Sequence, residues 1–300
     1  MSEPVGGDAL EPRAVFDQLL AALRPKLHRY CARMIGSVID GEDVVQEALV
    51  KAIEAFPAAG VVANREAWLF RIAHNAALDF LRRRARRDAR GSDKDLEMIV
   101  DPADPVADRQ IAAASLRTFM RLPVAQRSSV ILMDVLGYSL EEIGGMTDVS
   151  IPAVKAALHR GRERLRALAL EPDDQRLPVL AEAERGRLAA YVDRFNARDF
   201  DAVRAMLADE VRLELVNKLR LKGRKEVENY FTNYGRVHNW RFTPGLVEGR
   251  PAVLVHDPGR PTAPPRYFIL LEWAESGLAQ IRDFLYASYA TDGAEMVALG

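Results

Sequence analysis

The chain has 300 residues, of which 49% are hydrophobic and 28% are charged, and its formal net charge is −1. This length and balance predict a multidomain globular chain rather than one large enzyme domain. The single cysteine, Cys31, excludes an intrachain disulfide framework and a multi-cysteine metal site, and we expect it to be buried in a helix of a cytoplasmic protein. The chain has no apolar run of about eighteen residues and no signal-peptide pattern, so we predict no association with a membrane.

The first part of the chain contains three stretches in which apolar residues recur at every third or fourth position. This spacing predicts amphipathic helices over residues 13–34, 41–56 and 66–87, with a kink at Pro25 in the first helix. The outer face of the second helix is acidic. The third helix ends in a dense run of arginines, which are Arg82, Arg83, Arg84, Arg86, Arg87 and Arg90.

A stretch rich in aspartate and proline follows at residues 89–109. Because no apolar period survives there, we predict a flexible acidic linker. Helical spacing returns over residues 110–121. Pro123 then opens a further helix as its first residue, and Gly137 closes that helix.

Residues 139–166 have the spacing of a helix-turn-helix. Ser139 and Glu142 predict a capping box at the start of the first helix, and we expect Ser150 to cap the second. The exposed face of the second helix is basic, so its first residues could reach base edges in the major groove while its later arginines reach phosphates. The alternative is a helical hairpin with a solvated basic face, and the arginine run of the earlier helix has the same alternative.

The last part of the chain differs in character after a second, proline-containing linker that begins at Pro172. Apolar spacing predicts helices near residues 188–195, 200–207 and 226–231. Alternation of apolar and polar residues predicts strands over 211–215, 240–243, 252–256, 267–273 and 278–286. Helices followed by strands predict an α+β domain.

Several strings in the helical half resemble the extracytoplasmic-function sigma factors of bacterial RNA polymerase, over roughly residues 10–170. The segment from Asp40 to Glu47 is similar to the helix with which the family binds the polymerase clamp, and Trp68 to Arg84 is similar to its promoter-melting helix. Four further strings resemble the family's fourth region, which reads the minus-thirty-five element: Leu122-Pro123, Gln126-Arg127, residues 134–143 and residues 154–160.

The resemblance implies an all-α half, with a sigma region 2 bundle at 10–88 and a sigma region 4 helix-turn-helix at 110–170. It also implies site residues for each partner. Core RNA polymerase would be bound by Asp40, Asp43, Gln46, Glu47 and Val50. Minus-ten DNA would be bound by Arg71, Asn75, Asp79, Arg82, Arg83 and Arg86, with residues 57–65 holding a flipped base. Minus-thirty-five DNA would be bound by Ser150, Pro152, Lys155, Ala156, His159, Arg160 and Arg162.

Residues 184–290 resemble the SnoaL-like domains, an α+β cone of the ketosteroid-isomerase type. The Asn196 to Asp201 turn and the terminal strand from Ala279 to Phe284 carry this resemblance. It implies a candidate ligand pocket formed by Tyr230, His238, Trp240, Tyr267, Asp283 and Tyr286. The alternative is that these aromatic residues are core and Asp283 is a surface or hydrogen-bonded strand residue, and we favour it because no spacing defines an acid/base pair.

Together these patterns predict a sigma factor that binds core RNA polymerase and promoter DNA, without catalytic residues, a metal ion or a cofactor. The SnoaL-like domain would modulate its activity, through an intramolecular contact with the sigma modules. Two alternatives stay open. One is a helix-turn-helix regulator that acts without polymerase, and the other is an enzyme of isomerase or cyclase type in the C-terminal domain.

Overall fold

The computed structural model describes residues 12–58, 62, 64–88, 115–171 and 180–299. The chain divides into two compact units, Met1–Glu171 and Pro172–Gly300, and each has a hydrophobic core of its own. The first unit is helical and the second contains a sheet, so the predicted fold class is confirmed. The predicted acidic linker at 89–109 lies outside the described residues.

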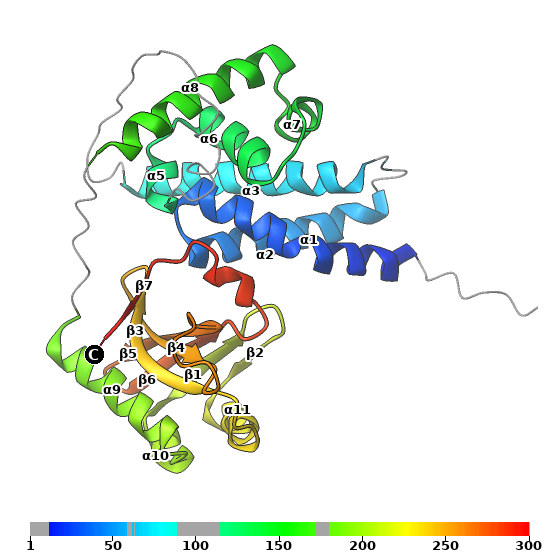
Figure 1. Cartoon of the computed structure of the whole chain (residues 1–300). Helices are drawn as coiled ribbons and strands as arrows, with labels where there is room; N and C mark the ends of the chain where they lie inside the picture. The colour runs from blue at the N-terminus through cyan, green and yellow to red at the C-terminus, as the bar shows by residue number, and fades with distance from the viewer. Residues whose placement is uncertain (1–11, 59–61, 63, 89–114, 172–179, 300) are drawn as a thin grey trace, which may run out of the picture. The chain divides into compact units, whose positions relative to one another are not determined.

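Three helices form the first part of the helical unit (Figure 1): α1 Pro12–Ile35, α2 Val38–Ala55 and α3 Arg65–Asp88. All three were predicted, but α2 begins before residue 41. Ser37 explains the earlier start, because its side chain accepts a hydrogen bond from the Asp40 amide and so caps the helix. A single 3-10 turn, Phe56–Ala58, follows α2.

Close packing of α1 against α2 depends on Gly41 and on a buried ion pair. A Cβ atom on Gly41 would lie 2.8 Å from the Ala32 Cα atom, so no larger residue fits at this crossing. Glu42 is fully buried on α2, and its carboxylate accepts a hydrogen bond of 3.1 Å from Nε of Arg24 on α1. Cys31 is buried on α1, as predicted, and burial raises the pKa of its thiol.

The second part of the helical unit contains α5 Leu116–Met120, α6 Val124–Val130, a π-helical turn Ile131–Val135, α7 Leu140–Thr147 and α8 Ile151–Ala169. Pro123 precedes the first residue of α6 and occupies the N-cap position, one residue outside the predicted place. Gly161 permits α8 to approach α6, since an added Cβ atom would lie 2.7 Å from a Val130 methyl carbon.

The predicted capping box of α7 is present. Ser139 Oγ accepts from the Glu142 amide at 3.3 Å, and the Glu142 carboxylate accepts from the Ser139 amide at 2.8 Å. Asp148 ends α7 in the left-handed conformation at φ 59°. Ser150 occupies the N-cap position of α8, as predicted, but its side chain forms no capping hydrogen bond.

One buried core joins these helices with the first three. Arg127 is 4% exposed, and its guanidinium donates to the main-chain carbonyls of Met34, Met120 and Leu122. Tyr138, which precedes α7, donates its hydroxyl to the carboxylate of Glu66 on α3. The helices of the predicted regions 2 and 4 therefore pack together within the first unit.

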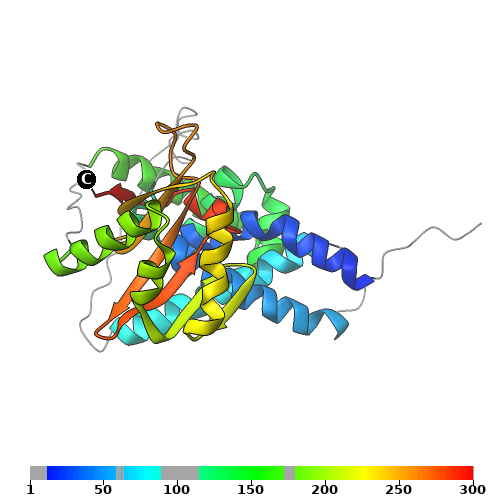
Figure 2. The same cartoon turned by 90° about the horizontal axis from the view of Figure 1, so that it is seen from below.

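The C-terminal unit packs helices against a seven-stranded sheet (Figure 2). Its helices are α9 Glu182–Asn196, α10 Phe200–Ala205 and α11 Arg224–Arg236. Its strands are β1 Leu207–Leu215, β2 Leu219–Lys222, β3 Arg241–Val247, β4 Arg250–His256, β5 Tyr267–Ala274, β6 Gly277–Asp283 and β7 Met296–Ala298. The strand order is β2-β1-β6-β5-β4-β3-β7, and only β1 and β6 pair in parallel among the described strands.

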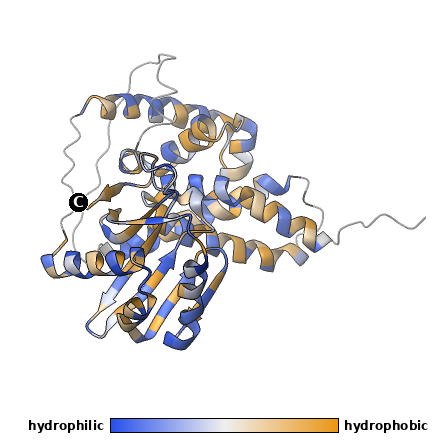
Figure 3. Cartoon of the chain, turned by 60° about the horizontal axis from the view of Figure 1, so that its bottom comes forward, coloured by the Kyte–Doolittle hydropathy of each residue, from blue (hydrophilic) through white to orange (hydrophobic). Residues whose placement is uncertain are grey.

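Five of these strands correspond to the five that alternation predicts, with boundaries shifted by a few residues. The hairpin partner β2 and the terminal strand β7 were not predicted, since four and three residues are too short for a period of two to show. Figure 3 shows hydrophilic and hydrophobic residues interleaved along the helices and strands of both units. Such interleaving lets each element bury one face and expose the other.

Candidate polymerase and DNA interface, and a cavity in the C-terminal unit

The outer face of α2 exposes both acidic and apolar side chains. Asp43 is exposed, Val50 is 50% exposed, and Asp40, Gln46 and Glu47 are half-buried. These five residues lie on one face because α2 buries the alternate face in the core. The structure therefore brings together the complete set predicted for polymerase binding.

Glu47 also connects α2 to α3. Its carboxylate accepts from Arg83 at 2.8 Å and from Lys51 at 2.8 Å. The hydrogen bond from Arg83 is the main cause that lowers the pKa of Glu47 below its ordinary value. The residues predicted to bind polymerase and those predicted to bind DNA thus meet at one ion pair.

The solvent face of α3 carries the residues predicted to bind minus-ten DNA. Five of them are exposed and Asp79 is half-buried. Asp79 accepts from Arg82 at 3.1 Å, and Arg71 pairs with Asp148 at 3.4 Å. The face is basic overall and lies opposite the buried side of α3. The flipped-base segment, 57–65, is described only in part, because residues 59–61 and 63 lie outside the described residues, as does Arg90.

The helix α8 presents most of its predicted DNA contacts to solvent at its N-terminal end. Ser150, Pro152, Lys155, His159 and Arg160 are exposed, whereas Ala156 is half-buried. Arg162 is different. Its guanidinium pairs with Asp134, whose side chain is only 2% exposed, and the Nε hydrogen bond measures 2.9 Å. This ion pair connects α8 to the π-helical turn Ile131–Val135.

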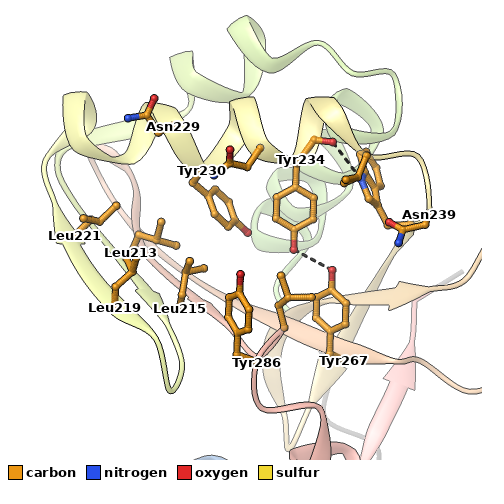
Figure 4. Close-up of a pocket in the computed structure, with 14 residues that line it drawn as sticks. Leu213, Leu215, Leu219, Leu221, Asn229, Tyr230, Tyr234, Asn239, Tyr267 and Tyr286 are labelled. Carbon is orange, nitrogen blue, oxygen red and sulfur yellow. Dashed lines mark hydrogen bonds between the residues drawn. The ribbon is translucent and has the colours of Figure 1, made fainter. Parts of the chain in front are cut away.

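A cavity of about 410 Å³ opens in the C-terminal unit, beside α11 and the β1–β2 hairpin (Figure 4). Four of the six residues predicted for a ligand pocket line it, namely Tyr230, Trp240, Tyr267 and Tyr286. His238 is exposed and does not line it. Asp283 is fully buried behind the lining residues.

Asp283 holds a group of tyrosines in place. Its Oδ2 atom accepts from Tyr234 at 2.8 Å and from Tyr230 at 3.0 Å, and its Oδ1 atom accepts from the Leu285 amide at 2.8 Å. The Tyr234 and Tyr267 hydroxyls lie 3.0 Å apart. Burial raises the pKa of Asp283 to about 6, although these hydrogen bonds act in the opposite direction.

Sequence reasoning missed the apolar side of this cavity. Leu213 and Leu215 on β1, with Leu219 and Leu221 of the hairpin, form that side. A leucine at every second position from 213 to 221, interrupted only at the turn, was the signal that could have identified it. The described residues contain no group of three or more histidine, cysteine or acidic side chains that could hold a metal ion, and no described helix is long and apolar enough to cross a membrane.

Two family models match the helical unit: Sigma-70 region 2 over residues 19–87 and Sigma-70 region 4 over residues 116–165. The chain is also 35% identical over 164 residues to the ECF RNA polymerase sigma factor SigM of Mycobacterium tuberculosis. The aligned region covers 55% of this chain and 80% of that protein. The chain belongs to the ECF RNA polymerase sigma factor family. This sigma factor directs transcription initiation at promoters, with RNA polymerase and DNA as its partners.

The solved structures that are similar to this sigma factor include a sigma factor and an enzyme. The extracytoplasmic function sigma factor SigJ of Mycobacterium tuberculosis matches with a TM-score of 0.36 and 20% identity, over 89% of this chain and 95% of that chain. The epoxide hydrolase/cyclase-like enzyme SalBIII of salinomycin pyran ring formation matches with a TM-score of 0.28 and 21% identity, over 39% of this chain and 98% of that chain.

Proposed function

We propose that the sigma factor binds core RNA polymerase through the outer face of α2, with Asp43, Glu47 and Val50 at the centre of the contact. The observation that supports this most directly is an exposed valine set among carboxylates on one helical face. The carboxylates would attract a basic partner surface, and Val50 would add an apolar contact at the centre of the interface. Promoter DNA would bind to the exposed face of α3, where Asn75 can reach a base and the arginines of this helix can reach phosphates.

The helix α8 is proposed to read the minus-thirty-five element in the major groove. Lys155 and His159 lie one turn apart on its exposed face, near the N-terminal end that would meet base edges. Arg160 would contact phosphate. We propose that Arg162 mainly positions α8, because its guanidinium is already paired with Asp134. Because the partners are polymerase and promoter DNA, we infer the cytoplasm as the site of action.

The C-terminal unit is proposed to modulate this activity by contacting the sigma modules, rather than to catalyse a reaction. A carboxylate that acts as the general base of an isomerase or cyclase must reach the substrate. Asp283 does not line the cavity, and both of its oxygens already accept hydrogen bonds from neighbouring groups. This arrangement favours a positioning role for Asp283.

The polymerase contact can be tested by reversing one exposed charge. We expect Asp43→Lys to weaken holoenzyme assembly by about tenfold or more, because it places a like charge against the basic partner surface that an acidic helix would require. The matched control is Asp17→Lys on α1, because Asp17 is also exposed, pairs only with Arg13 of its own helix among the ion pairs of the described residues and has no proposed contact with polymerase. Assembly would be measured by titrating labelled sigma factor with core polymerase. Equal affinities for the two variants would contradict the proposal.

A further inference from the structure

The cavity of the C-terminal unit has no role in the transcription functions proposed above. Its volume of about 410 Å³ lies within the usual range of small-molecule sites. Fourteen described residues line it, and all of them are leucine, valine, asparagine, tyrosine or tryptophan, so none carries a charge at neutral pH. A charged ligand would lose its hydration there without gaining an opposite charge, and this cost favours a neutral ligand.

The two sides of the cavity differ in chemistry. Leucines of the β1–β2 hairpin form one side, and the phenol rings of Tyr234, Tyr267 and Tyr286 form another (Figure 4). Leu219 and Tyr286 are 40% and 48% exposed, so apolar surface continues to the opening. An apolar body of a ligand would therefore lie against the leucines, and a polar group would point toward the tyrosines.

The hydrogen bonds of Tyr230, Tyr234 and Tyr267 favour a ligand group that donates a hydrogen bond at this place in the cavity. Tyr230 and Tyr234 each donate their single hydroxyl proton to Asp283. The bond between Tyr234 and Tyr267 must then be donated by Tyr267, because Tyr234 has no second proton to give. Tyr230 and Tyr267 consequently face the cavity with oxygen lone pairs, and these oxygens can accept hydrogen bonds but have no proton left to donate.

We propose that this cavity binds a neutral, largely apolar alcohol or phenol, whose hydroxyl donates a hydrogen bond to the phenolic oxygen of Tyr267 or Tyr230. The apolar part of the ligand packs against Leu213, Leu215 and Leu219. A ketone or ether of the same shape can only accept, so it leaves both oxygens without a donor.

Three probes of similar size separate these possibilities when each is titrated into the full chain by calorimetry. The probes are 2-naphthol, which donates a hydrogen bond, 2-methoxynaphthalene, which only accepts, and 2-naphthoate, which is charged. We expect 2-naphthol to bind about five- to tenfold more tightly than 2-methoxynaphthalene, the difference that one net hydrogen bond supplies. We expect 2-naphthoate to bind most weakly.

Variants assign the preference to one residue. Either Tyr267→Phe or Tyr230→Phe, according to which oxygen accepts, should bring 2-naphthol down to the affinity of 2-methoxynaphthalene and leave the latter unchanged. The matched control is Tyr191→Phe, because the Tyr191 hydroxyl is buried in the same unit, has no hydrogen-bond partner among the described residues and does not line the cavity. Should Tyr267→Phe fail to fold, Leu219→Gln on the exposed hairpin should weaken both neutral probes about twofold or more.

Three results would overturn the proposal: equal affinities of 2-naphthol and 2-methoxynaphthalene, tightest binding by 2-naphthoate, or no saturable binding of any probe below about 1 mM. All readouts are binding constants of the probes. A failure here would therefore leave the transcription proposal untouched, and a failure of polymerase binding would leave this one untouched.

Discussion

Two charged side chains, Arg127 and Asp283, are buried in different cores and are held mainly by neutral polar groups. Burial lowers the pKa of Arg127 to about 10, so its guanidinium is still charged at neutral pH while it donates to main-chain carbonyls. The carboxylate of Asp283 accepts hydrogen bonds from the phenols of Tyr230 and Tyr234 and from the Leu285 amide. Neutral partners offset only part of the cost of burying a charge, so burial favours the neutral form of each group. The pKa of Arg127 is therefore lowered, and the pKa of Asp283 is raised.

Asp283 should give the C-terminal unit a characteristic pH dependence. Its pKa is about 6 in the folded chain and near 3.9 when unfolded, so between these values the folded state binds more protons than the unfolded state. Stability therefore rises as the pH falls from about 6 to about 4, by roughly 3 kcal/mol for this group alone. Above pH 6 the buried carboxylate is ionised and the gain is absent.

The variant Asp283→Asn cannot titrate and should lack this component. Urea unfolding of the full chain, followed through the transition of the C-terminal unit at several pH values, would measure the difference between wild type and variant. Parallel pH profiles of the two proteins would show that Asp283 is not the group responsible.

At the scale of the elements, α7 and α8 begin at serines that behave differently. Ser139 takes part in a complete capping box, whereas Ser150 forms no side-chain bond to its helix. Both serines are exposed, so burial does not explain the difference. The side chain of Ser150 is thus not used in holding α8 together, which is compatible with its proposed place at the DNA.

These two serines provide a matched pair of variants. Ser139→Ala should lower the free energy of unfolding of the helical unit by about 1 kcal/mol, because the Glu142 amide loses the Ser139 hydroxyl oxygen that caps it. Ser150→Ala should change it by less than about 0.5 kcal/mol. Urea titrations of both variants would measure this, and an equal loss in both would refute the assignment of the caps. Only Ser150→Ala is expected to weaken binding to a minus-thirty-five element, as measured with holoenzyme.

At the scale of the whole molecule, the division into two units rests on two separate cores. Every residue of the first core cluster belongs to Met1–Glu171, and every residue of the second belongs to Pro172–Gly300. The helical unit ends with a bidentate ion pair, in which Arg121 donates to both carboxylate oxygens of Glu171 at 2.5 and 3.1 Å. A fragment that retains Glu171 keeps this contact.

Truncation after Glu171 tests the proposed modulation. We expect the fragment to fold, since its core loses no buried residue, and to direct transcription from a cognate promoter at a rate that differs at least twofold from the full chain. Circular dichroism would establish folding before transcription is measured with core polymerase. Activity equal to that of the full chain would remove the modulatory role and leave the sigma function intact.

The sequence alone determined the features that depend on residues close together in the chain. Apolar spacing located the helices α1, α2 and α3, a serine and a glutamate three residues apart located the capping box of α7, and alternation located five strands. The sigma family could be identified from strings within single helices, such as Asp40 to Glu47. Short-range patterns of this kind record helix and strand geometry directly.

Only the tertiary structure decided which distant side chains meet. Tyr230 and Tyr234 reach Asp283 across 53 and 49 residues of chain, and Arg83 reaches Glu47 across 36. Spacing along the chain could not show that Arg162 pairs with Asp134, or that His238 does not line the cavity that its neighbours line. The reason is physical: such contacts depend on how helices and strands pack, and packing is set by the whole core rather than by any local period.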